Sequence, residues 1–241
     1  MRLKRFKKFG NTGNPKYKDF SMSKILKWFL SNVSGPIIIW YLKKDRRYRY
    51  RGIELLIKQG VFHPGFFFST KFLLNTIDKE DVSELKFLEL GAGSGLISFY
   101  FAKKGALVLA TDINQKAIDG LEFNKSNLKS NIQIIHSDLF SQIPKQTFDI
   151  IVVNPPFYPK NPKNQEEMAW FCGDEFQYFY QLFSQIGEYL KADSKVFMSL
   201  SVDCNIEKIQ EIGSKSKFKF SLLEKKRILG ELNYIYQIFK S

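Results

Sequence analysis

The sequence is poor in the residues that form disulfides or bind metals. Its 241 residues include two cysteines, Cys172 and Cys204, and two histidines, His63 and His136. Their spacing matches neither a disulfide framework nor a zinc motif, so we expect no metal cofactor. The sequence also has no G-x-x-x-x-G-K-[ST] P-loop, no Ser-His-Asp set and no sustained repeat. These absences exclude disulfide-rich scaffolds, zinc-binding modules and P-loop nucleotide hydrolases.

No segment is continuously apolar over the roughly 20 residues that a membrane-spanning helix needs. The most apolar segment, residues 25–42, is interrupted by Lys27, Ser31-Asn32 and Ser34-Gly35-Pro36. A signal peptide would place its apolar core nearer the start and would show a small-residue cleavage site. We therefore expect two short helices that meet at Gly35-Pro36 and pack on the rest of the chain. Attachment to a membrane surface is the alternative, and we expect a cytoplasmic monomer.

A glycine-rich motif, Glu-Leu-Gly-Ala-Gly-Ser-Gly, occupies residues 89–95. The apolar run before it predicts a buried parallel strand over residues 86–90, and residues 96–103 predict a helix after it. Gly91, Gly93 and Gly95 therefore lie at a strand-to-helix turn, where Cβ atoms would block the approach of a ligand. A dinucleotide-binding turn has the spacing G-x-G-x-x-G, but Leu96 stands at the position of its third glycine. The turn is either a binding loop for another ligand or purely structural.

Aspartates follow the next two predicted strands, residues 106–110 and 132–136. Asp112, beside Ile113, ends the first, where a carboxylate can accept both hydroxyls of a ribose. Asp138, beside Leu139, follows the second and can accept a hydrogen bond from an adenine amino group. Simpler interpretations remain: Asp112 as an N-terminal residue of a helix over residues 115–127, and Asp138 as a loop or capping residue.

The fourth predicted strand, residues 148–153, leads into Asn154, Pro155, Pro156 and Phe157. The two prolines remove backbone donors and fix φ, so the turn is stiff. The side-chain oxygen of Asn154 and a nearby backbone carbonyl can accept both hydrogens of an NH₂ group. This aims the nitrogen lone pair at an incoming methyl group, and Phe157 offers a face for a flat amide or base. Positioning supplies much of the rate for such a weak nucleophile; the alternative is a loop that happens to contain two prolines.

With these motifs in this order, the chain resembles the class I S-adenosylmethionine-dependent methyltransferases, specifically the methyltransferase small domain group. That group includes HemK-type glutamine methyltransferases and ribosomal RNA guanine-N2 methyltransferases, and N6-adenine methylases share the Asn-Pro-Pro-Phe element. The resemblance covers about residues 60–241. It implies S-adenosylmethionine as the cofactor and methyl transfer to nitrogen, with release of S-adenosylhomocysteine.

The resemblance also implies roles for individual residues. Residues 60–65 with Ser69-Thr70 look like the segment that these enzymes place over the cofactor, although His63 is equally well an ordinary turn histidine. The catalytic set holds the target nitrogen: Asn154, Pro155, Pro156 and Phe157. The cofactor set binds the methionine, ribose and adenine parts: Glu89, Gly91, Gly93, Gly95, Asp112, Ile113, Asp138, Leu139 and Asn154.

The predicted fold is α/β: a doubly wound, Rossmann-like, seven-stranded sheet with a C-terminal antiparallel hairpin. Residues 195–200 predict a strand, residues 206–212 a helix, and residues 218–225 and 233–239 the hairpin. Residues 159–164, rich in proline and asparagine, are a candidate substrate lid. Residues 175–190 predict an amphipathic helix with a mainly aromatic stripe along one face. We assign this stripe to the core rather than to a base-binding platform, and its residues are Phe176, Phe179, Tyr180, Phe183 and Ile186.

Excess positive charge is confined to one part of the chain. Residues 1–58 hold sixteen Lys and Arg against three Asp and Glu, whereas residues 59–241 hold 21 of each. We therefore predict a basic, mainly helical N-terminal extension over residues 1–58 and a methyltransferase domain over residues 59–241. The extension is either a solvated basic face or a contact for an anionic partner. Its most basic segment is the candidate RNA-binding element, in which tyrosines stack on unpaired bases: Lys43, Lys44, Arg46, Arg47, Tyr48, Arg49, Tyr50 and Arg51.

The predicted activity is N-methylation of a planar NH₂ group by S-adenosylmethionine. We favour a nucleobase exocyclic amine in structured, ribosomal RNA because of the basic extension. The alternative acceptor is the side-chain amide of a glutamine in a translation factor, whose NH₂ has the same geometry. A non-catalytic RNA-binding module is a third interpretation, and the intact motif at residues 154–157 argues against it.

Overall fold

The structure is a computed structural model, and it describes residues 41–66, 68–165, 167–228 and 231–240. All of these belong to one compact unit, Ile38–Ser241. The helices predicted within residues 25–42, and the alternative of membrane attachment, lie almost entirely outside the described residues. Among the helices of the described ranges, none is both long and apolar enough to cross a membrane.

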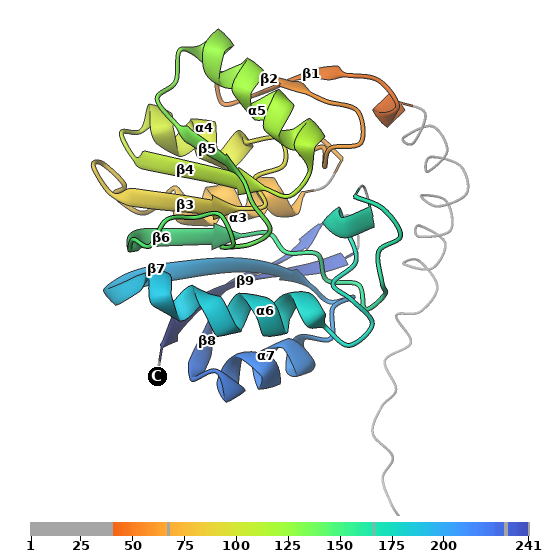
Figure 1. Cartoon of the computed structure of the whole chain (residues 1–241), viewed down its shortest axis with the longest axis vertical. Coiled ribbons are helices and arrows are strands. Elements are labelled where there is room, and N and C mark those ends of the chain that lie inside the picture. Colours follow the sequence, from red (N-terminus) through yellow and green to blue (C-terminus); the bar gives the residue numbers. More distant parts are fainter. Residues whose placement is uncertain (1–40, 67, 166, 229–230, 241) are drawn as a thin grey trace, which may run out of the picture. The chain divides into compact units, whose positions relative to one another are not determined.

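A seven-stranded sheet in the order β5-β4-β3-β6-β7-β9-β8 forms the centre of the unit (Figure 1). The first five strands of this order run parallel, and β9 pairs antiparallel with both β7 and β8. This confirms the predicted doubly wound sheet with a C-terminal antiparallel hairpin. The strands are β3 (Lys86–Leu90), β4 (Leu107–Asp112), β5 (Gln133–His136), β6 (Phe148–Val153), β7 (Leu190–Ser201), β8 (Phe218–Ile228) and β9 (Glu231–Lys240).

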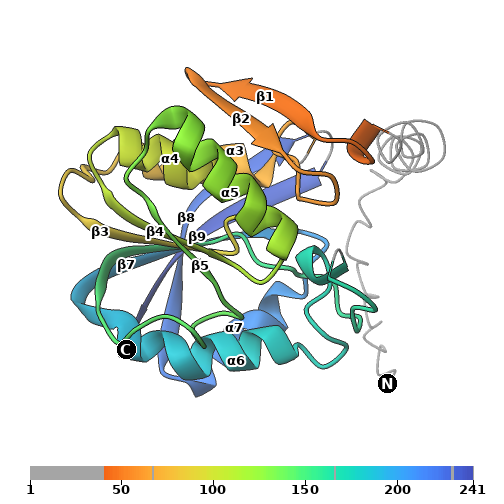
Figure 2. The same ribbon diagram turned by 45° about the horizontal axis from the view of Figure 1, so that its top comes forward.

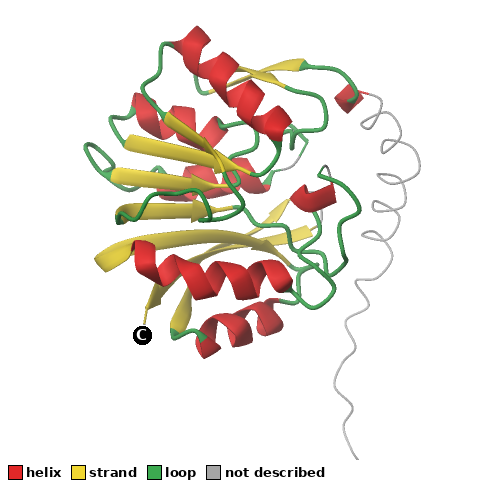
Figure 3. Cartoon of the chain, in the orientation of Figure 1, coloured by secondary structure: helices red, strands yellow, loops and turns green. Residues whose placement is uncertain are grey.

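Helices cover both faces of the sheet, which explains why its parallel strands are apolar on both sides (Figure 3). One face carries α3 (Ser69–Ile77), α4 (Leu96–Lys103) and α5 (Gln115–Leu128). The other face carries α6 (Gln177–Gln185) and α7 (Ile206–Lys215). The chain also forms two short 3₁₀ helices, η2 (Glu167–Ala169) and η3 (Ile186–Tyr189). In the predicted aromatic stripe Tyr180 is exposed on the outer side of α6, whereas the other four residues are buried: Phe176, Phe179, Phe183 and Ile186.

Alternation along the strands sorts their side chains between the two faces. In β6, Ile150 and Val152 join the core cluster under α3–α5, while Ile151 and Val153 join the cluster under α6 and α7. Asn154 continues this alternation toward the α3–α5 face. The polar end of β6 therefore points to the side of the sheet on which the helices α3 and α4 begin.

The described part of the predicted extension is a β-hairpin, β1 (Arg46–Tyr50) and β2 (Ile53–Ile57), where we expected mainly helix. Figure 2 shows the hairpin beside α4 and α5. Ile53, Leu55 and Ile57 are buried in the same core cluster as those helices. The buried side chain of Asn124 in α5 forms hydrogen bonds with both backbone groups of Leu56 in β2. It accepts from the Leu56 N–H at 2.8 Å and donates to the Leu56 carbonyl at 2.9 Å. A domain boundary at residue 58 remains a prediction.

Candidate active site at the carboxyl edge of the sheet

The predicted site residues lie at the carboxyl ends of four neighbouring parallel strands, the usual ligand edge of such sheets. The glycine loop follows β3, and Asp112 ends β4 beside Ile113. Asp138 and Leu139 follow β5, and the segment from Asn154 to Phe157 follows β6. The topology therefore brings the predicted cofactor set and the predicted catalytic set to one edge.

Two glycines of the loop have different roles. Gly95 has φ of 75° at the N-cap of α4, and a Cβ there would lie 2.4 Å from Leu121 Cδ2 and 2.8 Å from a ring carbon of Phe99. It is therefore required for packing α4 against α5. Gly91 has φ of 69°, and a Cβ there would meet no heavy atom within 4 Å. The open side of Gly91 is available to a ligand.

Asp112 connects the end of β4 to the glycine loop. One carboxylate oxygen, Oδ2, accepts from the Gly93 N–H at 2.7 Å, and Oδ1 accepts from the Asn114 N–H at 2.8 Å. Burial raises the pKa of the Asp112 carboxyl, while these two N–H donors oppose the increase. The N-cap of α5 is Asn114 rather than Asp112, because its side chain accepts from the Lys116 N–H. Each oxygen of Asp112 keeps a lone pair for a ribose hydroxyl.

Glu89 is a buried carboxyl that serves the first turn of α4. Its Oε2 accepts from the backbone N–H of Ser98 at 2.8 Å and from the Ser98 hydroxyl. Ser98 is the third residue of α4, so Glu89 satisfies an N–H that has no partner within the helix. Burial raises the pKa of Glu89 to about 8, against the effect of the Ser98 donors, and the charge of Asp112 adds to the increase. Sequence reasoning missed this bond, and contact of Glu89 with a cofactor remains a prediction.

The ends of β4 and β5 are joined by His136, whose Nε2 lies 2.7 Å from the Ile113 carbonyl oxygen. Asp138 is exposed, and Leu139 is buried with φ of 45°. Sequence reasoning missed Tyr178 of α6. Burial raises the pKa of its hydroxyl, and the negative charges of Asp112 and Asp138 add to that increase.

Asn154 is held by two hydroxyls from different elements. Its Oδ1 accepts from the Ser199 hydroxyl of β7 at 2.5 Å, and its Nδ2 donates to the Thr70 hydroxyl oxygen of α3 at 3.4 Å. Pro155 is buried, and Phe157 is half-buried with its ring against Tyr158. The side-chain amide of Asn154 is therefore fixed at the carboxyl edge before any substrate arrives.

Two loops meet beside this site. The Trp170 carbonyl accepts from the backbone N–H groups of Phe157 and Tyr158, at 3.2 and 3.0 Å. The Trp170 ring lies 5.2 Å from the ring of Phe62, and a Cβ on Gly93 would lie 3.8 Å from the Cβ of Phe62. The loop before α3 and the loop after β6 thus meet through Phe62 and Trp170, and this contact lies beside both the glycine loop and Phe157. A lid function for residues 159–164 remains a prediction.

His63 lies in an aromatic environment. Its Nδ1 accepts from the Gly65 N–H at 3.1 Å, which closes a tight turn, and its ring lies 5.2 Å from Tyr48 and 5.1 Å from Phe66. Burial lowers the pKa of His63. These contacts favour the interpretation of His63 as a structural turn residue.

The eight predicted RNA-binding residues fall into two groups. Four serve the fold: Arg46 donates to the Tyr41 carbonyl, Arg51 pairs with Asp78 at 2.6 Å, Tyr48 packs on His63, and Tyr50 donates to Asn75. Tyr48 and Tyr50 face the core, so we remove them from the expected base-stacking surface. The other four are exposed: Arg47, whose ion pair with Glu54 is itself exposed, and Lys43, Lys44 and Arg49, which have no hydrogen-bond or ion-pair partner among the described residues.

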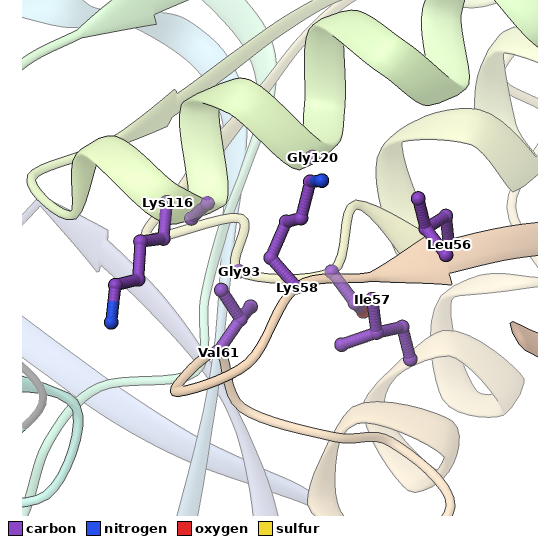
Figure 4. A pocket seen from close by; sticks show the side chains of 9 residues that line it. Leu56, Ile57, Lys58, Val61, Gly93, Lys116 and Gly120 are labelled. Carbon is purple, nitrogen blue, oxygen red and sulfur yellow. The ribbon is translucent and has the colours of Figure 1, made fainter. Parts of the chain in front are cut away.

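A shallow depression lies beside the glycine loop, between the chain after β2 and α5 (Figure 4). Lys58 and Val61 line it from one side, Lys116 and Gly120 from the other, and Gly93 lies between them. Its lining includes neither Asp112 nor Asn154. We therefore do not assign the cofactor to this depression.

The model of the methyltransferase small domain family matches residues 52–172. The chain belongs to this family. Membership confirms the predicted enzyme class and S-adenosylmethionine as the cofactor. The residues present fit this cofactor, because Gly91 leaves open space for it and Asp112 keeps acceptor sites for its ribose.

A release factor glutamine methyltransferase from Fusobacterium nucleatum is 29% identical over 195 residues, which cover 71% of this chain and 54% of that protein. A putative protein N5-glutamine methyltransferase from Methanocaldococcus jannaschii is 38% identical over 109 residues, 45% of this chain and 53% of that protein. The chain thus spans about half the length of these relatives. A 16S rRNA N2 G1207 methyltransferase of T. thermophilus, solved with AdoMet and guanosine, has a TM-score of 0.61 at 19% identity, covering 82% of this chain and 50% of that one. The last similarity shows the fold.

Proposed function

We propose that the chain transfers a methyl group from S-adenosylmethionine to a planar NH₂ nitrogen held by Asn154, and that the acceptor is a nucleobase amine in structured RNA. The observation that carries the reaction class is the fixed amide of Asn154 at the same edge as the glycine loop and Asp112. The exposed basic residues on and before β1 support the choice of RNA.

The side chains have separate tasks in this proposal. Asp112 accepts from the ribose hydroxyls, and the open side of Gly91 admits the cofactor. When bound, S-adenosylmethionine supplies an electrophilic methyl group. Asn154 accepts from the target NH₂ and turns the nitrogen lone pair toward that methyl group, while Phe157 supports the flat acceptor. The nitrogen displaces S-adenosylhomocysteine from the methyl group, becomes acidic as it gains that group, and then loses one proton to water, so no strong base is needed beforehand.

Positive charge supports an anionic macromolecule as the acceptor. Lys43, Lys44, Arg47 and Arg49 are exposed on one segment, in the part of the chain that carries the whole excess positive charge. Lysine and arginine side chains neutralise phosphates and position a nucleic acid without reading its sequence. A basic segment on the same unit as the Asn154 site suits an RNA acceptor.

A glutamine side chain is the second candidate acceptor. The relatives from Fusobacterium nucleatum and Methanocaldococcus jannaschii are named as glutamine methyltransferases. A glutamine amide presents the same NH₂ geometry as a nucleobase amine, so Asn154 serves either acceptor.

A labelling experiment with the full chain separates the two. The purified protein is incubated with tritiated S-adenosylmethionine and cell extract, and parallel samples are then treated with nuclease or protease. The RNA proposal predicts macromolecular label that nuclease releases and protease spares, with little label from Asn154→Ala. Label that only protease releases identifies a protein acceptor, and absence of label from both fractions contradicts the proposed activity.

A further inference from the structure

We propose that Ser199 and Thr70 are positioning residues that set the orientation of the Asn154 amide for the acceptor. The inference rests on the proposed function, in which the oxygen of Asn154 receives the target NH₂. It concerns which end of the amide faces the acceptor, and it applies whether the acceptor is a nucleobase or a glutamine.

The sheet register brings Ser199 beside Asn154. Val153 of β6 pairs with Met198 of β7, so the next residues along these parallel strands, Asn154 and Ser199, are also neighbours. Both continue the alternation toward the α3–α5 face, since Val152 and Phe197, two residues earlier in each strand, lie in the core cluster on that face. Thr70, in the first turn of α3, reaches the amide from that layer.

The hydrogen bonds define which end of the amide faces which element. The Ser199 hydroxyl of β7 donates to Oδ1 of Asn154 at 2.5 Å. The longer contact of 3.4 Å, on the Thr70 hydroxyl, belongs to the amide nitrogen.

This orientation leaves an acceptor lone pair on the Asn154 oxygen free for the target NH₂ group. An asparagine amide has two acceptor lone pairs on oxygen and two donor hydrogens on nitrogen. Ser199 occupies one lone pair and Thr70 accepts one hydrogen, so the Asn154 oxygen keeps one lone pair for the target NH₂. A rotation of the amide by half a turn would place its own NH₂ against the target NH₂, donor against donor. Retaining the observed orientation therefore keeps the acceptor nitrogen correctly aimed.

The strand also provides a matched control for Ser199. Ser201 lies two residues further along β7, faces the same side and is equally buried, with 2% of its surface exposed in each case. Its hydroxyl donates to Glu231 rather than to Asn154. Removal of either hydroxyl therefore deletes one buried oxygen from β7, but only Ser199→Ala releases the amide of Asn154.

The test compares Ser199→Ala, Thr70→Val, Thr70→Ser, Ser201→Ala and Asn154→Ala in the full chain. Methyl transfer from tritiated S-adenosylmethionine is measured on total ribosomal RNA and on a soluble protein extract, and cofactor affinity is measured by calorimetry. We expect kcat to fall about ten- to a hundredfold in Ser199→Ala, with little change in cofactor affinity, because misplacement of a positioned group has effects of this size. Thr70→Val should lower kcat and Thr70→Ser should restore it, while Ser201→Ala should retain the wild-type kcat.

Nuclear magnetic resonance supplies a readout that does not depend on turnover. The side-chain NH₂ signals of Asn154 are identified in the ¹⁵N-labelled protein by their absence from Asn154→Ala. Ser199→Ala should shift or double these signals, and Ser201→Ala should leave them in place.

The outcomes separate the inference from the proposed function. Full activity in Asn154→Ala contradicts the proposed function itself. Loss of activity in Asn154→Ala, together with wild-type kcat and unchanged Asn154 signals in Ser199→Ala, overturns the inference alone. Equal losses in Ser199→Ala and Ser201→Ala would also overturn it, because they would indicate a general effect on β7.

Discussion

The carboxylate of Asp112 accepts a 2.7 Å hydrogen bond from the backbone N–H of Gly93. This bond joins the end of β4 to the loop after β3, so the residue expected to hold the cofactor also fixes the shape of the loop around it. A substitution at Asp112 therefore removes a ligand contact and loosens the loop at the same time.

Substitution of Asp112 should weaken cofactor binding in a graded way. Asp112→Ala should lower the affinity for S-adenosylmethionine by about 1.5–3 kcal/mol, or ten- to a hundredfold, because it removes hydrogen bonds to a charged group. Asp112→Asn keeps one acceptor oxygen and should lose less. Calorimetry gives both affinities, and circular dichroism checks the fold. Wild-type affinity in both variants would move the cofactor away from this loop.

The two glycines should separate stability from binding. Gly95→Ala should destabilise the protein by about 2–4 kcal/mol, because it adds left-handed strain and a methyl group 2.4 Å from Leu121. Gly91→Ala should destabilise the protein only by the left-handed backbone strain, about 1–2 kcal/mol. Its methyl group, however, would occupy the space left for the cofactor. Urea unfolding and calorimetry should therefore rank the variants in opposite orders, and the same order in both would contradict the assignment.

Glu89 should make stability depend on pH. Burial raises the pKa of its folded form from 4.5 to about 8. Between these values the folded state holds a proton that the unfolded state has lost, so the free energy of unfolding falls as pH rises, by at most about 1.4 kcal/mol per pH unit. Glu89→Gln is neutral at every pH and should not lose this stability.

The stability of the wild-type protein relative to Glu89→Gln should therefore decline from pH 5 to pH 8. Denaturant titrations at several pH values within this window measure the difference directly. A constant difference, or one that grows in favour of the wild type, would show that Glu89 is ionised in the folded protein.

The basic segment should divide into binding and structural residues. Replacement of Lys43, Lys44, Arg47 and Arg49 by Ser should make the plot of log RNA affinity against log salt less steep by about 3, since each lost phosphate contact removes about 0.7–0.9 from the slope. The variant should weaken binding to most RNA sequences alike and leave cofactor affinity unchanged.

Arg51→Ser is the comparison for this experiment. Arg51 pairs with Asp78, whose carboxyl also accepts from Lys104, and the Lys104 and Arg51 donors lower the pKa of Asp78 to about 2. The variant should lose about 1 kcal/mol of stability above pH 4, after allowance for partial exposure, and keep the wild-type salt slope. If Arg51→Ser flattens the slope and the four-residue variant does not, the assignment of the two groups is wrong.

The sequence predicted the sheet and the positions of its motifs because both follow from local patterns. Alternating or continuous apolar residues predicted the positions of the strands. The glycine loop and Asn154 each directly follow one of these strands. The β1–β2 hairpin was missed although Ile53, Leu55 and Ile57 alternate, because each strand has only five residues and β1 consists mostly of arginine. The inward direction of Tyr48 depends on what it packs against, and a single sequence does not contain that information.

Contacts between distant residues set the rest of the site. Ser98 meets Glu89 only because α4 folds back over β3, and Ser199 meets Asn154 only because β6 and β7 are neighbours in a given register. A helix-capping residue is normally sought just before a helix, whereas Glu89 lies in the preceding strand. The packing of α4 on β3 determines the first pair. Strand order and register, which a single sequence does not reveal, determine the second.

The most direct test of the account is the effect of Asn154→Ala on binding and on turnover in the same preparation. Calorimetry measures the affinity for S-adenosylmethionine, and transfer of the tritiated methyl group to the labelled fraction measures turnover. The account predicts nearly unchanged affinity and a turnover lower by about two orders of magnitude or more. Wild-type turnover in this variant would contradict the account, because Asn154 would then be part of a structural turn and the target nitrogen would be held elsewhere.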